Sequence, residues 1–190
     1  MPKRSAEHAA QSREKIIASA SALMRANGFD GIGIDAITAH AGLTAGAFYR
    51  HFASKQVLLE EVVARAMQEA SEHMPRIATA DDIATFVAAY LSQRKFKQVI
   101  AGCVVAAMAP DLTRNGDVVR SHAALYVQNI HAAMSRALAH LGDEQAASIA
   151  WQIMSAATGG LVLARLVGGK VGAQIDAAVV DGTQQLIASH

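Results

Sequence analysis

The residues whose types and spacing suggest chemistry follow a glycine at position 42. Phe48 and Phe52, four positions apart, predict the buried side of a helix of about two turns. The opposite side of that helix then carries a glycine, a polar aromatic ring and a cation. A short helix with this exterior adds little stability, but it is well suited to enter the DNA major groove. The residues predicted on that side are Gly46, Ala47, Tyr49 and Arg50.

Lys55 indicates a second point of contact with DNA. Ser54 is the natural N-cap of the next helix, so Lys55 lies in its first turn, where a cation opposes the positive end of the helix dipole. A docked phosphate would accept from both the lysine and the free backbone N–H groups. A solvated lysine, at a cost of roughly a few tenths of a kcal/mol, is the alternative.

Two helices are predicted ahead of the short one, and they would hold it in place. Residues 8–27 have apolar positions at helical spacing, and Asn27-Gly28 ends that pattern. A second helix begins near Ile34 and stops at Ala41-Gly42, because glycine readily adopts the left-handed conformation of a helix end. Thr44 is placed to cap the following helix by accepting from its backbone N–H groups. Together these elements predict a helix-turn-helix.

The helix-turn-helix residues stand in the register of a known signature. They are Gly28-Phe29, Ile34-Asp-Ala-Ile37, Ala41-Gly42-Leu43-Thr44-Ala-Gly46-Ala-Phe48-Tyr49-Arg-His51-Phe52-Ala-Ser54-Lys55 and Leu58-Leu59. On these residues, positions 8–65 resemble the DNA-binding domain of the tetracycline-repressor (TetR/AcrR) family of transcriptional regulators. The resemblance implies an all-α homodimer that binds palindromic operator DNA and is released, as a repressor, by a small ligand in its carboxy-terminal domain.

The resemblance also implies roles for residues in and next to the short helix, which would be the recognition helix of the helix-turn-helix. Thr44, Tyr49, His51 and Lys55 would bond phosphates, and the guanidinium of Arg50 matches the two acceptors of guanine. Two alanines stand where relatives often have polar side chains, so discrimination should depend on Arg50, Tyr49 and DNA shape. A basic arm at the amino terminus adds two weaker candidates. The predicted DNA-binding residues are Lys3, Arg4, Thr44, Ala45, Gly46, Ala47, Tyr49, Arg50, His51 and Lys55.

Composition and charge are consistent with a soluble, cytoplasmic helical protein. Hydrophobic residues make up 52% of the 190 positions and charged residues 17%, which favours packed helices over disorder. The net charge is only +1, but residues 1–55 hold seven Lys and Arg against four Asp and Glu. Residues 56–190 hold ten against twelve, so the modest basic surplus lies with the helix-turn-helix. No amino-terminal apolar signal segment is evident.

Two domains are predicted, with residues 1–55 as the DNA-binding domain and 76–190 as the effector-binding and dimerisation domain. A long helix over residues 55–73 would connect them, with Thr79 or Asp81 capping the helix that follows. The later helices are expected at 82–94, 96–109, 116–141, 143–167 and 172–188. Residues 111–116 are predicted to form a loop, and Asp143 to be an N-cap.

The last two predicted helices are apolar on more than one face, which a second copy of the chain would explain. The resemblance likewise implies a four-helix dimer interface. The residues predicted at that interface are Ala147, Trp151, Met154, Thr158, Leu161, Arg165, Ile175 and Val179.

An effector pocket for a flat or apolar neutral ligand is expected among residues 81–165, although ordinary core packing is the alternative for each residue. Cys103, the single cysteine, fits a buried inert thiol better than a redox sensor, since no cation lies within a helical turn after it. The predicted pocket residues are Phe86, Tyr90, Cys103, Met108, His122, Tyr126, Met134, Trp151 and Met154.

No catalytic, metal-binding or cofactor motif occurs in the sequence, so an enzyme is not expected. One alternative to the regulator remains open at this point. The chain would then be a helical, dimeric small-molecule binding or scaffold protein whose amino-terminal bundle does not bind DNA.

Overall fold

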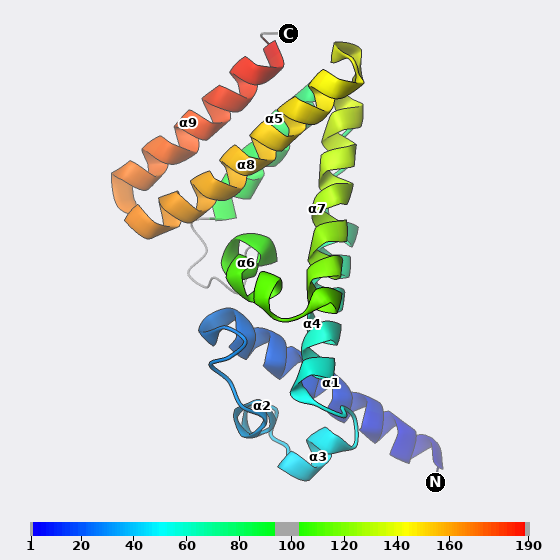
Figure 1. Ribbon diagram of the computed structural model, residues 1–190. Coiled ribbons are helices and arrows are strands. Elements are labelled where there is room, and N and C mark those ends of the chain that lie inside the picture. The colour runs from blue at the N-terminus through cyan, green and yellow to red at the C-terminus, as the bar shows by residue number, and fades with distance from the viewer. Residues whose placement is uncertain (1, 94–102, 189–190) are drawn as a thin grey trace. The chain divides into compact units, whose positions relative to one another are not determined.

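The structure is a computed structural model that describes residues 2–93 and 103–188, with the side chains from residue 6 onward. Helices make up nearly all of this part, which contains no strand, so the predicted all-α fold is confirmed (Figure 1). The helices are α1 (Pro2–Asn27), α2 (Ile34–His40), α3 (Ala45–Tyr49), α4 (Lys55–Glu72), α5 (Ala80–Ser92), α6 (Val104–Arg114), α7 (Asp117–Ala137), the 3-10 helix η3 (Ala139–Leu141), α8 (Asp143–Val167) and α9 (Gly169–Ala188).

The chain divides into two compact units. Unit 1 comprises residues 1–69 and 108–123, and unit 2 comprises residues 70–107 and 124–190. Helices α4, α6 and α7 therefore each contribute residues to both units. The predicted domain boundary near residue 76 stays a prediction, and it did not anticipate that residues 108–123 would pack with the amino-terminal helices.

Unit 1 is built around large side chains from its first four helices. Ile16 and Met24 of α1 are buried together with Phe48, Phe52 and Leu58, as their helical spacing predicted. The rings of Phe48 and Phe52 lie 5.7 Å apart between centroids, a distance at which aromatic pairs attract beyond their burial. This apolar centre fixes the short helix α3 against the longer helices.

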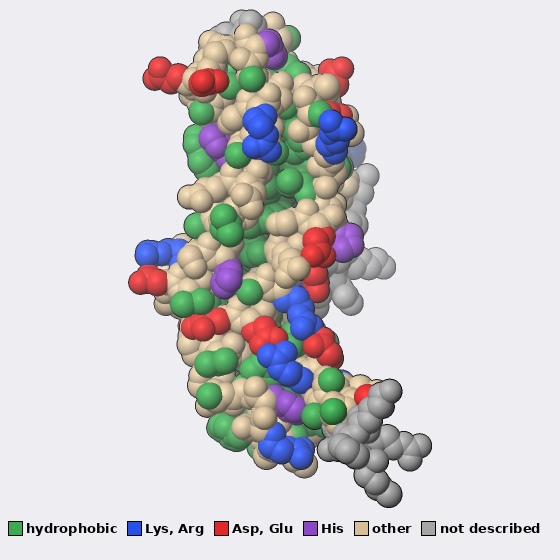
Figure 2. Space-filling model, turned by 90° about the vertical axis from the view of Figure 1, so that its right-hand side faces the viewer, with side chains coloured by type: hydrophobic (Ala, Val, Ile, Leu, Met, Phe, Trp, Pro, Cys, Tyr) green, Lys and Arg blue, Asp and Glu red, His purple; other side chains and the backbone are tan. Residues whose placement is uncertain are grey.

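Ion pairs join α1 to α4 at the edge of this core. Arg13 pairs with Glu61, and its guanidinium carbon also lies 5.0 Å from the centroid of the Phe52 ring. Arg65 pairs with Glu14, and the hydrogen bond from Arg65 lowers the pKa of the Glu14 carboxyl. Figure 2 shows basic and acidic side chains next to one another on this part of the surface. These arginines are thus already partnered within the protein.

The loop predicted over residues 111–116 is wrong for residues 111–114, because α6 continues through Pro110 to Arg114 and only residues 115–116 separate it from α7. Met108 and Leu112, one turn apart, are both buried, and this burial compensates for the hydrogen bond that proline cannot donate. Residues 96–102 of the helix predicted at 96–109 lie outside the described residues. Within unit 1, Gln56 donates to the carbonyl of Asn115 over 2.9 Å, which ties the start of α4 to the α6–α7 turn.

Unit 2 packs α8 against α5 and α9. Ile83, Leu91 and Ile153 belong to its buried core, and α8 and α9 run side by side in Figure 1. Gly160 permits this approach, since a Cβ atom there would lie 2.7 Å from Cγ2 of Val179. Gly159, the next residue, has no atom of the described chain within 4 Å of the equivalent position.

We expect Gly160→Val to lower the free energy of unfolding by about 2 kcal/mol, because the larger side chain forces α8 and α9 apart. Gly159→Ala is the matched control on the same helix, and it should raise the free energy by about 0.5 kcal/mol through helix propensity. Urea denaturation followed by circular dichroism, at one protein concentration, measures both. Equal effects of the two substitutions would contradict the packing.

The caps of unit 2 were only partly predicted. Thr79 forms a capping box with Asp82 at the start of α5, which confirms one of the two residues predicted there. The N-cap of α8 is Gly142 rather than Asp143, which is the first helical residue. Gly142 has a φ of 87°, a value that few residues other than glycine adopt, and this explains the shift by one position.

The capping box predicts a pH-dependent contribution to stability. Hydrogen bonds from the backbone N–H of Ala78, and then from the hydroxyl and N–H of Thr79, lower the pKa of Asp82. A carboxyl group whose pKa is lowered by folding stabilises the folded state at pH values above its pKa in the unfolded chain, which is about 3.9. This contribution is lost as the pH falls below that value. The thermal midpoints of wild type and Asp82→Asn should therefore differ at pH 7 and converge near pH 3. A constant difference would contradict this assignment.

Candidate DNA-binding surface and effector cavity

The turn between α2 and α3 has the geometry of a helix-turn-helix. Gly42 follows the α2 C-cap with a φ of 67°, in the left-handed region that was predicted for it. Leu43 donates its backbone N–H to the carbonyl of Thr38 over 2.8 Å, which closes the turn. These contacts orient α3 so that one side of it is buried and the other is exposed.

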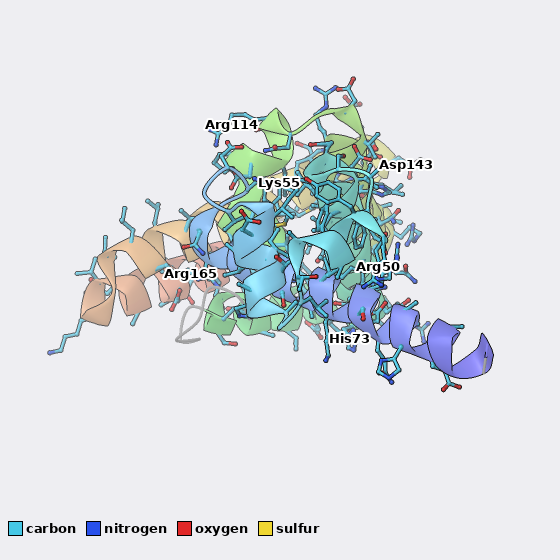
Figure 3. All side chains as sticks on the ribbon, turned by 90° about the horizontal axis from the view of Figure 1, so that it is seen from below. Arg50, Lys55, His73, Arg114, Asp143 and Arg165 are labelled. Carbon is cyan, nitrogen blue, oxygen red and sulfur yellow. The ribbon has the colours of Figure 1, made fainter. Side chains whose placement is uncertain are left out.

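The exposed side of α3 carries Tyr49 and Arg50. Tyr49 is 63% exposed, and its ring packs edge-on against Phe48 with centroids 5.3 Å apart. Arg50 is the exposed C-cap of α3 and makes no ion pair with any residue of the described chain. Figure 3 looks at this end of unit 1 and labels Arg50 and Lys55. A rigidly held phenol and a free guanidinium therefore face solvent together.

Ala47 is a correction to the sequence prediction. It was expected on the outward side of α3, but it is only 2% exposed and packs inward beside Phe48. A thymine-methyl contact by Ala47 is therefore not possible in this conformation. Ala45 and Gly46 remain exposed, as predicted.

The two residues predicted to cap α3 and α4 differ in whether their side chains make the capping hydrogen bond. Thr44 occupies the N-cap position of α3 but makes no side-chain cap hydrogen bond, contrary to the prediction, and its hydroxyl is exposed. Ser54 does cap α4, since its Oγ accepts from the backbone N–H of Val57 over 3.2 Å. Lys55 is half-buried at the first position of α4, and His51 is half-buried nearby. Lys3 and Arg4 belong to α1, but their side chains lie outside the described residues.

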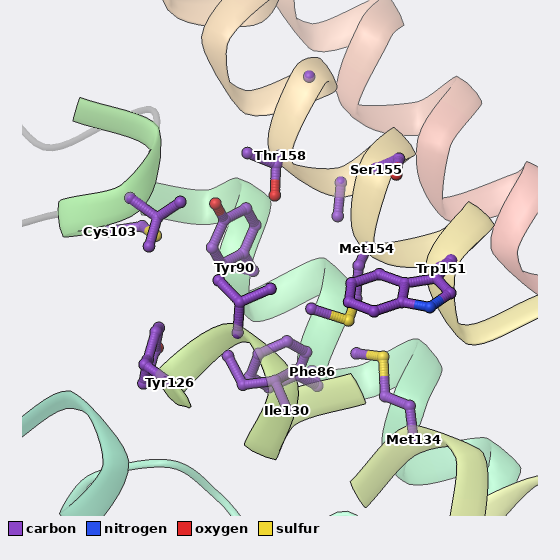
Figure 4. Close-up of a pocket in the computed structure, with 14 residues that line it drawn as sticks. Phe86, Tyr90, Cys103, Tyr126, Ile130, Met134, Trp151, Met154, Ser155 and Thr158 are labelled. Carbon is purple, nitrogen blue, oxygen red and sulfur yellow. The ribbon is translucent and has the colours of Figure 1, made fainter. Parts of the chain in front are cut away.

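Unit 2 contains a cavity of about 320 Å³ between α5, α7 and α8 (Figure 4). Its size falls in the range of small-molecule sites. Most of the residues predicted for an effector pocket line this cavity. They are Phe86, Tyr90, Cys103, Tyr126, Met134, Trp151 and Met154.

Two predicted pocket residues lie elsewhere. Met108 and His122 belong to unit 1 and do not line the cavity. Ile130 lines it and was missed, although it lies one turn from both Tyr126 and Met134, so helical spacing could have identified it. The other lining residues that were not predicted for the pocket are Val105, Val127, Ser155, Ala157, Thr158 and Gly159.

Two tyrosines in the cavity stay protonated. Burial raises the pKa of Tyr126 to about 12, and burial likewise raises the pKa of Tyr90. Cys103 is half-buried immediately before α6, and its backbone N–H donates to Oε1 of Gln93 over 2.8 Å. The cavity therefore presents uncharged tyrosine hydroxyl groups at neutral pH.

Trp151 lines the cavity and stacks on His131 of α7, which is not among the lining residues. Their rings stack with centroids 4.0 Å apart and an interplanar angle of 18°. His131 also donates from Nε2 to the carbonyl of Ala147 over 3.0 Å, which joins α7 to α8. Trp151 is the chain's single tryptophan, so its fluorescence reports on this cavity.

A face of α8 and α9 is exposed and largely apolar, and it differs from the stripe predicted for the dimer interface, which stays a prediction. Leu161 is fully buried, Arg165 donates to the carbonyl of Gln93, and Trp151, Met154 and Thr158 line the cavity. Half-buried Ala147, Ile175 and Val179 complete the predicted stripe. We define the outer face instead by residues of α8 and α9 that are exposed or that line the groove between the two helices, namely Ala156, Leu163 and Leu166 of α8 with Ala178, Gly182 and Gln185 of α9.

Helix α8 also meets the length and composition test for a membrane-crossing helix, which core helices of soluble proteins meet as well. Its inward residues, including Ile149 and Ile153, belong to the core of unit 2. This packing explains its apolar character without a membrane.

Comparisons with known proteins agree with this geometry. Residues 16–62 match the family model "Bacterial regulatory proteins, tetR family", whereas a comparison with curated proteins finds no match. Among solved structures, reduced NemR of E. coli is 17% identical with a TM-score of 0.77, over 92% of this chain and 95% of that one. A TetR regulator of Legionella pneumophila is 23% identical with a TM-score of 0.70, over 90% and 95%. SmeT, solved as a complex with triclosan, is 20% identical with a TM-score of 0.65, over 90% and 89%.

Proposed function

Because its residues 16–62 match the family model of tetR-family bacterial regulatory proteins, we propose that this chain is a cytoplasmic, homodimeric transcription regulator of that family. In this proposal it binds a palindromic operator, and a small neutral effector in the unit 2 cavity releases it. The observation that carries the proposal is the exposed pair Tyr49 and Arg50 on a short helix whose other side is buried.

DNA binding is supported by the charges that the protein leaves free. Arg13 and Arg65 are used in ion pairs between α1 and α4, whereas Arg50 makes none with the described residues. The N-terminus of α4 adds a site for a phosphate, because Ser54 satisfies the N–H of Val57 and leaves those of the first turn free beside Lys55. Contacts with the DNA bases and with the DNA phosphates would thus come from adjacent segments of the protein, the end of α3 and the start of α4.

Effector release is supported by the continuity of the helices. Val105 of α6 and Tyr126 of α7 line the cavity, and both helices also contribute residues to unit 1. In unit 1 the α6–α7 turn is bonded to Gln56 at the start of α4, next to Lys55. A ligand that binds better to the DNA-incompetent state would shift the population away from the operator, and one without that preference would change nothing. The SmeT neighbour shows that a protein of this fold can hold a small aromatic molecule.

The operator can be selected from random-sequence DNA duplexes and its affinity measured as a function of salt. We expect an inverted repeat and a binding constant that falls steeply with salt, with Tyr49→Ala weakening binding. No selected sequence, and no binding at low salt, would contradict the regulator. It would favour a helical small-molecule binding protein instead.

Lys55→Ala should reduce the slope of log affinity against log salt concentration by about 1 for each DNA-binding domain, because each domain loses one phosphate contact. Lys170→Ala, which removes the same charge from exposed α9 in unit 2, is the control and should leave the slope unchanged. An unchanged slope in Lys55→Ala would show that this lysine is merely solvated.

A further inference from the structure

The Tyr90 hydroxyl is an unused hydrogen-bonding group in the unit 2 cavity. Its oxygen is buried and makes no hydrogen bond of ordinary geometry with the residues that the structure describes, although Cys103 and Thr158 lie near enough to influence its pKa. Buried polar groups in proteins almost always have a partner, so an unpartnered one facing a cavity calls for a partner from a ligand. Figure 4 shows the hydroxyl directed toward the side where the Thr158 oxygen lies, with Cys103 beside it.

The rest of the cavity is apolar and largely aromatic. The rings of Phe86 and Tyr90 stack with centroids 6.2 Å apart and an interplanar angle of 25°. Trp151 lies on another wall with Met134 and Met154, whose flexible thioethers adapt to flat ligands (Figure 4). The described residues that line it include no charged side chain, so none of them offers a counter-charge to an ionic ligand.

We infer that the cavity takes a neutral, flat aromatic ligand with a carbonyl oxygen that accepts from the Tyr90 hydroxyl. A carbonyl has two lone pairs, so it can also accept from Thr158 on the same side of the cavity. The phenol of Tyr90 remains protonated, because its burial disfavours the phenolate, and it therefore acts as a donor. This inference rests on the proposed function, since it specifies the ligand class of the same cavity.

A matched pair of tricyclic probes tests the carbonyl requirement. 9-Fluorenone and fluorene have nearly the same shape and differ in the single acceptor oxygen. Isothermal titration calorimetry, with protein added to the probe, should show about tenfold tighter binding of fluorenone, because one hydrogen bond to a buried donor is gained. Benzophenone and diphenylmethane repeat the test with a bent skeleton, and the same preference is expected.

Two tyrosine variants assign the preference to one hydroxyl. Tyr90→Phe should remove the roughly tenfold preference by weakening the ketones alone, while Tyr126→Phe, which removes a hydroxyl from another wall of the cavity, should retain it. Circular dichroism establishes that both variants are folded. The inference is overturned if neither ketone binds, if wild type has no preference, or if Tyr90→Phe keeps it.

These titrations use the full-length protein without DNA, so they separate two kinds of failure. If the ketones bind as expected but the protein binds no operator, the regulator proposal fails and the ligand class stands. If an operator is found but the ketones do not bind, only the ligand class fails.

Discussion

Replacing Leu163 and Leu166 together by glutamate will leave the protein folded but monomeric, and will lower its affinity for a palindromic operator by about a thousandfold. Both residues belong to the outer face of α8 and α9, where they are 52% and 80% exposed. In a symmetric dimer this face would meet its own copy, so each substitution places two like charges in an apolar interface. Two linked DNA-binding domains bind a palindromic site about 10²–10⁴ times more tightly than one domain, and this advantage is lost in a monomer.

The small residues of the outer face support its self-association. Ala156 of α8 lines a groove with Ala178 and Gly182 of α9, so the backbones of two copies could approach closely there. Single large side chains at Leu163 and Leu166 would then fill the remaining space between four helices. This arrangement resembles the packing of a four-helix bundle.

Leu125→Glu is the matched control for the dimer prediction. Leu125 of α7 is 58% exposed but does not belong to the outer face. Light scattering after size exclusion should show a dimer for wild type and Leu125→Glu, and a monomer for the double variant. If the double variant remained dimeric, or if Leu125→Glu were monomeric, the dimer interface would have to lie on another surface.

The helix-turn-helix could be predicted from the sequence because its signals are local. Gly42 ends α2, and Phe48 and Phe52 mark the buried side of α3 at helical spacing. Ala47 was misplaced because its small apolar side chain fits either a buried or an exposed position. In so short a helix, tertiary packing decides between the two.

The orientation of α8 could not be predicted from the sequence. Its limits, Asp143–Val167, agree with the prediction, but apolar and small residues occur on all of its sides. Without a polar side there is no periodic signal to show which stripe faces the core, the cavity or solvent. Of the predicted interface residues, Met154 lines the cavity and Leu161 is buried in the core, while the interface itself stays a prediction.

The continuation of α6 was missed because the local signal was strong but misleading. Residues 110–116 contain proline, aspartate, asparagine and glycine, which together are typical of a turn. Burial of Met108 and Leu112 is a tertiary effect that outweighs these local preferences. The same segment packs with unit 1, which no local pattern indicated.

Arg50→Ala is expected to lower affinity for the selected operator by about 10- to 100-fold and affinity for random DNA by only about threefold. A guanidinium that bonds both acceptors of a guanine contributes about 1–3 kcal/mol of discrimination, whereas one lost charge weakens all DNA binding modestly. Arg50 can make this contact because it is exposed at the end of α3 and makes no ion pair with the described residues. Competition titrations with operator and random duplexes measure the two losses separately.

Arg50→Lys separates base recognition from charge at this position. Lysine keeps the positive charge but lacks the planar fork, so it should restore random-DNA affinity without restoring discrimination. Arg136→Ala removes an exposed arginine near the end of α7, in unit 2, and should change neither affinity. If lysine restored full discrimination, the planar fork would not be the feature that recognises the base. If Arg50→Ala weakened operator and random DNA equally, Arg50 would be a phosphate contact. Sequence recognition would then have to come from Tyr49 and from the shape of the DNA.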